Sequence, residues 1–207
     1  MPDLVPIDLI PVTQALPMEN EARFISAINQ IADLEFVPYL REAWLCYVSQ
    51  TYNASLIWIW CAVSCYIRAV VQHVGEDLFR FHFDGAYESL ERVNDEQLLE
   101  TCRKMGLLGF LDPARFGWVN DFRTRRNDLA HGKWNELATP KIVTDFAEGA
   151  VRNLLCRSVK EHDLSVDTAT LYEFVKFYTS PLNEERAAAL IILVTGEFVT
   201  VMVKTDS

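Results

Sequence analysis

A short polar run near the middle of the chain holds the side chains best suited to chemistry. Residues 125–132 have the sequence RRNDLAHG. If this segment is helical, Asn127 and His131 lie one turn apart on one face, where the amide can hold the imidazole in one tautomer. An arginine grips phosphate oxygens through a planar fork of N–H donors, and a histidine moves protons near neutral pH. Arg126, Asn127 and His131 are therefore the candidate catalytic residues, and the chemistry that they favour is phosphodiester chemistry.

The spacing of the two charged groups limits what one copy of the run can do. On a helix, Arg126 lies about 140° around the axis and about 7.5 Å along it from His131, so their heads do not converge automatically. A second copy of the run, brought up across a symmetric dimer interface, would supply a second arginine and histidine. We therefore expect a homodimer with both runs at its interface.

Residues 126–131 resemble the R-(N/D/H)-x-x-x-H signature of the HEPN superfamily, the higher eukaryotes and prokaryotes nucleotide-binding domains. A long apolar helix expected before the run, a helix over residues 98–108 and another over 142–156 are also similar to that family, so the resemblance spans about residues 20–160. Active members are mostly metal-independent endoribonucleases that dimerise, common in toxin–antitoxin, abortive-infection and CRISPR-linked defence. The resemblance implies no metal and no cofactor.

The resemblance also implies a role for each motif residue. Arg126 would bind the scissile phosphate and stabilise its developing charge, and His131 would act as general base or acid on the ribose 2′-hydroxyl or the leaving oxygen. Asn127 would orient one of the two. The products would be a 2′,3′-cyclic phosphate and a 5′-hydroxyl, so DNA should be inert. One departure is Lys133, which stands where toxins controlled by nucleotidyltransferase antitoxins carry a tyrosine; we do not expect control by adenylylation of that tyrosine.

Residues around the run are candidates for binding substrate. Arg123, Arg125 and Lys133 are suited to contacts with an RNA backbone, and Trp134 is suited to stacking on a base at the substrate mouth. Each has a structural alternative, since most basic residues form a solvated surface and most tryptophans belong to a core.

Two functions from different classes follow. The first is a metal-independent, dimeric HEPN-type endoribonuclease acting on RNA as a toxin or antiviral-defence effector, with an antitoxin or regulatory protein as a possible partner. The alternative is a non-catalytic HEPN-like module that binds a partner protein, a nucleotide or a nucleic acid as a regulator. In a purely structural interpretation, Arg126 pairs with Asp121 or Asp128 and His131 only caps the helix end.

Composition supports a folded, largely acidic body with one basic strip. The chain has 207 residues, half of them hydrophobic, and a formal net charge of −10. That charge is unfavourable for a broad nucleic-acid groove, but residues 101–133 hold seven basic residues against three acidic ones, which suits a small anionic site. The five cysteines form no Cys-x-x-Cys pair, which argues against a disulfide framework or a zinc ribbon.

The pattern of apolar residues predicts an all-α fold, a HEPN-like helical bundle with an N-terminal arm and a C-terminal helical appendage. The arm is residues 1–19, which are rich in proline; the helical domain is 20–160; and the extension is 161–207, with helices expected over 168–178 and 183–204. Within the domain we expect helices over 20–34, from Pro38 onward, from an Asn53 cap to about Phe81, from an Asn94 and Gln97 capping pair to Gly106, over 112–131, and over 139–160.

The long apolar helix has two interpretations. Residues 54–71 approach the length of a membrane span, but Arg68 and two serines interrupt the segment and polar residues follow it directly. We expect the buried central helix of a bundle and no membrane association. The start of the chain lacks a basic segment followed by an apolar stretch, so we expect no secretory signal and a reduced, cytoplasmic protein.

Overall fold

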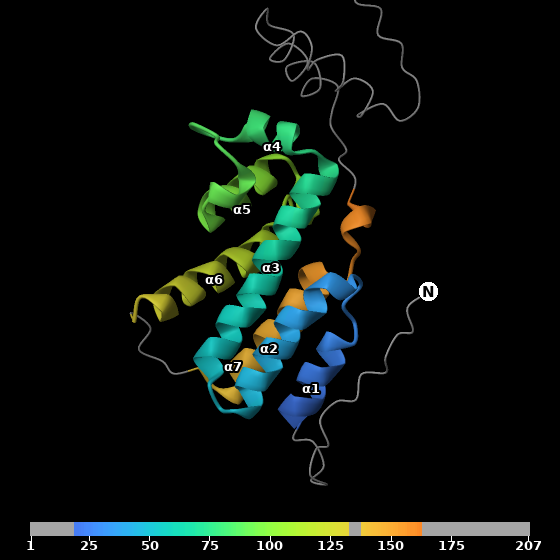
Figure 1. The fold of residues 1–207 in the computed structure, drawn as a ribbon, viewed down its shortest axis with the longest axis vertical. Helices are drawn as coiled ribbons and strands as arrows, with labels where there is room; N and C mark the ends of the chain where they lie inside the picture. Colours follow the sequence, from blue (N-terminus) through green and yellow to red (C-terminus); the bar gives the residue numbers. More distant parts are fainter. Residues whose placement is uncertain (1–18, 133–137, 163–207) are drawn as a thin grey trace, which may run out of the picture.

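The computed structural model describes residues 19–132 and 138–162, and these residues form an all-α fold without strands (Figure 1). The all-α prediction is confirmed. The arm up to residue 18, the segment 133–137 and the extension from residue 163 lie outside the described residues, and with them the helices expected over 168–178 and 183–204. Lys133 and Trp134 also lie outside the described residues.

Four helices lie side by side in the main bundle: α1 (Glu19–Ile28), α2 (Val37–Val48), α3 (Tyr52–Val74) and α7 (Pro140–Ala150) (Figure 1). Helix α2 packs most extensively on α3, and α7 contacts α1, α2 and α3. A π-helical turn, Val151–Leu155, continues α7. Helices α4 (Glu76–His82) and α5 (Asp95–Lys104) lie toward the C-terminal end of α3, and α6 (Pro113–Ala130) packs on α3, α5 and α7.

Helix α3 is the central helix of the bundle. It is long and apolar enough to cross a membrane by length and composition, but more than half of its most apolar stretch is buried inside the bundle, and ten of its residues, Ile59, Tyr66 and Val70 among them, are buried. Even Ser55 on this helix is buried, and its hydroxyl donates to the Ala43 carbonyl of α2 at 2.7 Å. The helix is therefore buried to the extent expected of a core helix. The polar residues that interrupt its apolar sequence favoured the same interpretation.

The predicted bounds of α3 and α4 are wrong. The sequence suggested one helix from an Asn53 cap to about Phe81, whereas α3 begins after Thr51 and ends at Val74, before Gly75, whose backbone has φ 127°. A residue with a side chain adopts that conformation only with strain, so the glycine separates α3 from α4. The Asn53 side chain instead accepts a hydrogen bond from the Ala138 backbone N–H at 3.2 Å, which ties the start of α7 to the start of α3.

The ends of α5 and α6 follow local signals. Asn94 caps α5, since its side-chain oxygen accepts from the Gln97 N–H at 2.9 Å, and Gly106 at φ 65° follows the helix. Asp112 caps α6 by accepting from the Ala114 N–H at 2.9 Å, Pro113 occupies the first turn, and the helix ends at Ala130 with His131 as its C-cap. These boundaries agree with the sequence prediction, which rested on the same caps.

An aromatic cluster fixes α6 against the bundle. Phe122 of α6 stacks on Phe146 of α7 with ring centroids 4.3 Å apart and meets Trp60 of α3 edge to face at 5.4 Å. Trp118 joins the cluster, with its ring 5.7 Å from Phe122. Because these contacts lie on the face of α6 that includes residues 118 and 122, they set the rotation of the helix and so the direction in which its later residues point.

Candidate active site

The polar run occupies the last two turns of α6, where the helix leaves the body of the bundle. Arg126 and Asn127 are half-buried, whereas His131 is exposed at the C-cap. The backbone N–H of His131 donates to the Asn127 carbonyl at 3.0 Å, and Gly132 follows with φ 64°, a left-handed conformation that ends the helix. The sequence prediction placed the helix end at the same glycine.

Arg126 points inward, toward α3 and α5. Its Nη1 donates to the Asn127 side-chain oxygen at 2.9 Å, and its Nη2 donates to a carboxylate oxygen of Asp95. The guanidinium also lies over the ring of Trp60, 5.5 Å from the ring centroid, which adds a cation–π contact. Its Nε is buried without a hydrogen-bond partner among the described residues. Arg126 is thus held in one direction by three groups on three helices.

Asp95 is the hub of this network. It is the first residue of α5, where the helix dipole stabilises a carboxylate, and its side chain is only 17% exposed. It accepts hydrogen bonds from Trp60 Nε1 at 2.9 Å and from the Ser64 hydroxyl at 3.1 Å, both on α3. Arg68 approaches the same carboxylate at 3.5 Å.

Two arginines from different helices approach the Asp95 carboxylate. The Arg68 guanidinium also donates to the backbone carbonyls of Leu90 and Val93, at 2.5 and 2.9 Å. These two residues precede α5, so the contacts hold the guanidinium beside the start of that helix. The side chains of Arg68 and Arg126 are 23% and 26% exposed, and both contact the carboxylate of Asp95. The Glu91 carboxylate also interacts electrostatically with Arg68, so described carboxylates largely balance the charges of the two arginines.

The structure joins Arg126 and Asn127 by a hydrogen bond, whereas the His131 side chain forms none with a described residue. The amide oxygen of Asn127 accepts from Arg126, so in this arrangement it orients the guanidinium rather than the imidazole. The His131 side chain forms no hydrogen bond with a described residue and faces the surface at the end of α6. One chain therefore presents a fixed guanidinium and an exposed imidazole that no hydrogen bond joins.

The structural interpretation predicted an ion pair for Arg126, but the observed partner is a different acidic residue. The sequence suggested Asp121 or Asp128, on the same helix, but the partner is Asp95 of α5, 31 residues away along the chain. Asp121 pairs instead with Arg125, one helical turn away, at 3.0 Å on the surface. Arg125 also lies over the Phe146 ring, 5.5 Å from its centroid.

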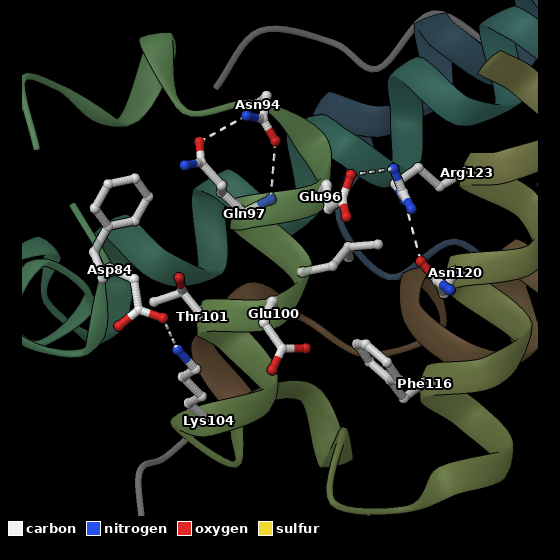
Figure 2. Close-up of a pocket in the computed structure, with 12 residues that line it drawn as sticks. Asp84, Asn94, Glu96, Gln97, Glu100, Thr101, Lys104, Phe116, Asn120 and Arg123 are labelled. Carbon is white, nitrogen blue, oxygen red and sulfur yellow. Dashed lines mark hydrogen bonds and ion pairs between the residues drawn. The ribbon is translucent and has the colours of Figure 1, made fainter. Parts of the chain in front are cut away.

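Arg123, the remaining basic candidate, faces α5. Its Nη1 is 3.3 Å from a Glu96 carboxylate oxygen, and its Nε donates to the Asn120 side-chain oxygen at 3.1 Å. It borders a cavity between α5 and α6 (Figure 2). Arg123 is therefore a candidate substrate-binding residue that lines a cavity.

The Cys61 thiol, which interacts electrostatically with Arg126 and Asp95, is not an activated nucleophile. Burial raises the pKa of the Cys61 thiol, and the nearby Arg126 opposes that shift only in part. Within the described ranges, no cluster of three or more His, Cys, Asp or Glu side chains has the arrangement of a metal site.

Sequence reasoning missed Asp95. The signal available was Trp60, because a tryptophan in an apolar helix needs an acceptor for its indole N–H, but the sequence does not say which acidic residue supplies it.

Comparisons with protein-family models, with curated proteins and with solved structures give no match to this chain.

Proposed function

We propose that the chain is a HEPN-type, metal-independent endoribonuclease that cleaves RNA with Arg126 and His131. The observation that carries the proposal is the guanidinium of Arg126, held by Asp95, Asn127 and Trp60, five residues before an exposed histidine at a helix end. A pre-oriented guanidinium loses little freedom when it binds a phosphate, so it stabilises the charge that develops in the transition state.

In this mechanism the two residues have separate roles. Arg126 binds a non-bridging oxygen of the scissile phosphate, while Asn127 keeps the guanidinium in place. His131 removes the proton of the ribose 2′-hydroxyl or protonates the leaving 5′-oxygen. Attack by the 2′-oxygen on phosphorus forms a 2′,3′-cyclic phosphate as the bond to the 5′-oxygen breaks, so the second product carries a 5′-hydroxyl.

A homodimer completes the site in this proposal. His131 is exposed at the end of α6, whereas Arg126 is held by Asp95 of α5, and the helical spacing of the two residues does not by itself bring their side chains together. A symmetric partner that packs on the end of α6 places its own histidine near this arginine. We propose a cytoplasmic toxin or antiviral-defence effector, held in check by an antitoxin or another regulatory protein.

The Asp95 pairing favours a second candidate, a non-catalytic helical module of the same architecture that binds a partner protein, a nucleotide or a nucleic acid. In that function, the ion pair between Arg126 and Asp95 ties α6 to α5 and to α3 through Trp60, and the arginine serves the fold. The acidic body of the protein, with a net charge of −10, suits a protein partner.

Cleavage of end-labelled single-stranded RNA in excess EDTA separates the two candidates. We expect the wild type to cut and Arg126→Ala and His131→Ala to lose activity by at least about a hundredfold, the usual contribution of a general acid or base. His73→Ala is the matched histidine control, because His73 is also exposed near the C-terminal end of a helix, α3. Arg92→Ala removes one exposed arginine elsewhere. Equal activity of all five proteins, or no cleavage by a folded dimeric wild type, contradicts the ribonuclease.

A further inference from the structure

One face of α2 carries large apolar side chains that are exposed. Leu45 and Val48 are 39% and 47% exposed, and the neighbouring Trp44 is half-buried. Positions 41, 44, 45 and 48 have the i, i+3, i+4, i+7 spacing of a single helical face, so these three side chains and Arg41 form one row, which we call the α2 stripe. The buried residues of α2, Tyr47 among them, lie on another side of the helix, against the bundle.

Aromatic rings border the α2 stripe. The Trp44 ring stacks on Tyr47 with centroids 5.4 Å apart and an interplanar angle of 12°, and Phe24 of α1 lies 5.5 Å from both rings. Tyr52, the first residue of α3, meets the Tyr47 ring edge to face at 5.6 Å. Proline-rich segments bind aromatic surfaces of this kind, because the extended polyproline conformation is already formed and loses little freedom on binding. The stripe therefore suits an apolar, proline-rich segment.

Arg41 adds a positive charge to one end of the α2 stripe. Its side chain is exposed and forms no hydrogen bond or ion pair with a residue that the structure describes. Glu42 is the next residue, but it lies about 100° away around the helix axis and so on a different face. A segment that lies along the stripe and carries an acidic side chain complements this arginine.

The N-terminal arm has the composition that this surface requires. Residues 4–12, LVPIDLIPV, hold six large apolar side chains, two prolines and one aspartate, Asp8. Asp3 is the other charged side chain among residues 1–18, which include no lysine, arginine or histidine. An apolar segment with acidic residues and no basic ones matches an apolar stripe that ends in an arginine.

The arm joins the described body close to the α2 stripe. Helix α1 begins at Glu19, at the end of the bundle where α2 finishes (Figure 1), and Glu21 in its first turn interacts electrostatically with Tyr47. The stripe is about 10.5 Å long, seven residues at about 1.5 Å each. Asp8 stands eleven residues before Glu19, a reach of about 34 Å at about 3.1 Å per residue in the polyproline conformation. Asp8 can therefore reach Arg41, and covalent attachment gives the arm a high effective concentration at the stripe.

We propose that residues 4–12 dock in an extended conformation along the α2 stripe of the same chain. Apolar side chains of the segment cover the apolar part of the stripe, and Asp8 pairs with Arg41. The proposal does not depend on the ribonuclease function, because the stripe lies on α2 and the motif on α6. The arm of a second copy and a proline-rich partner protein fit the same surface, and the test separates these occupants.

Photo-crosslinking of the full chain tests the contact directly. A photoreactive benzoylphenylalanine takes the place of Ile7, beside Asp8, and tandem mass spectrometry locates the residue to which it attaches. A denaturing gel shows whether the product has the mass of one chain or of two. The double variant Leu45→Glu, Val48→Glu removes the apolar surface, and because both side chains are exposed the fold is retained, which circular dichroism checks. Leu111→Glu is the control, since Leu111 is a 74% exposed leucine before α6.

We expect attachment within residues 41–48, in a product with the mass of one chain whose yield does not change on dilution. The double variant should lower that yield at least about fivefold, because two apolar side chains no longer gain burial, whereas Leu111→Glu leaves it unchanged. Arg41→Glu should lower the yield about two- to fivefold, the range of an exposed ion pair, and Asp8→Lys added to it should restore the yield.

Three results overturn the proposal. The first is attachment elsewhere on the body or no product at all, which leaves the stripe to a partner protein. The second is a yield that the double variant does not change. The third is a product with the mass of two chains whose yield falls on dilution, which assigns the stripe to the arm of a second copy. Failure of Asp8→Lys to restore the yield in Arg41→Glu contradicts the proposed ion pair.

Discussion

The hub at Asp95 yields a prediction about stability that follows directly from its contacts. Replacing Asp95 by alanine removes the acceptor of the Trp60 indole N–H and of the Ser64 hydroxyl, and it leaves the guanidinium groups of Arg68 and Arg126 without their anion. Breaking a buried ion pair from one side costs about 3–5 kcal/mol. Because these side chains are 17–26% exposed, water screens part of that loss. We expect Asp95→Ala to lower the free energy of unfolding by about 2–3 kcal/mol.

Two further variants isolate the cause. Asp95→Asn keeps an oxygen that can accept from Trp60 but removes the charge, so we expect a smaller loss of about 1–1.5 kcal/mol. Asp121→Ala removes an exposed carboxylate that pairs with Arg125 within α6, and the expected loss is about 0.3–0.5 kcal/mol. Urea unfolding followed by circular dichroism at 222 nm measures all three. A loss in Asp95→Ala no larger than that in Asp121→Ala would refute the hub.

Substitutions of two glycines and of one partly buried histidine give further predictions about stability. Gly149→Ala should lower the free energy of unfolding by about 1–3 kcal/mol, because a Cβ there would lie 2.3 Å from the Trp118 ring. A Cβ at Gly117 meets no atom within 4 Å, so Gly117→Ala should raise the free energy of unfolding by about 0.5–1 kcal/mol. Urea unfolding measures both. Burial lowers the pKa of His162, whose Nε2 is 2.6 Å from the Tyr66 hydroxyl. The unfolded chain therefore binds more protons at this residue than the folded chain, and the free energy of unfolding falls as the pH drops below about 6.5. His162→Gln should reduce that slope between pH 7 and 5, and an unchanged slope would contradict it.

Much of the fold could be predicted because its signals are local. The caps at Asn94 and Asp112 lie within three residues of the groups that they satisfy, and Pro113 and Gly132 mark the two ends of α6 in sequence. The break at Gly75 was missed, because the apolar pattern continues on both sides of it. A glycine inside a helical pattern is usually tolerated, and only the observed φ of 127° shows that this one ends the helix.

The site was harder to predict than the fold. The spacing from Arg126 to His131 is visible in the sequence, but the direction of the guanidinium depends on Asp95, and that contact joins residues 31 positions apart. An acidic residue in the first turn of a helix is common and does not by itself indicate a long-range partner. The cavity beside Arg123 likewise depends on the packing of α5 on α6, which no local pattern encodes.

The most direct test of the proposed ribonuclease function is the requirement for a 2′-hydroxyl at the cleaved bond. Wild-type protein in EDTA is given an RNA strand, the same strand with 2′-O-methyl groups, and the corresponding DNA, and the fragment ends are identified by mass spectrometry. We predict that only the unmodified RNA is cut, to 2′,3′-cyclic phosphate and 5′-hydroxyl ends. Cleavage of the methylated strand or of DNA, or no cleavage of RNA by the folded dimer, would contradict the roles assigned to Arg126 and His131.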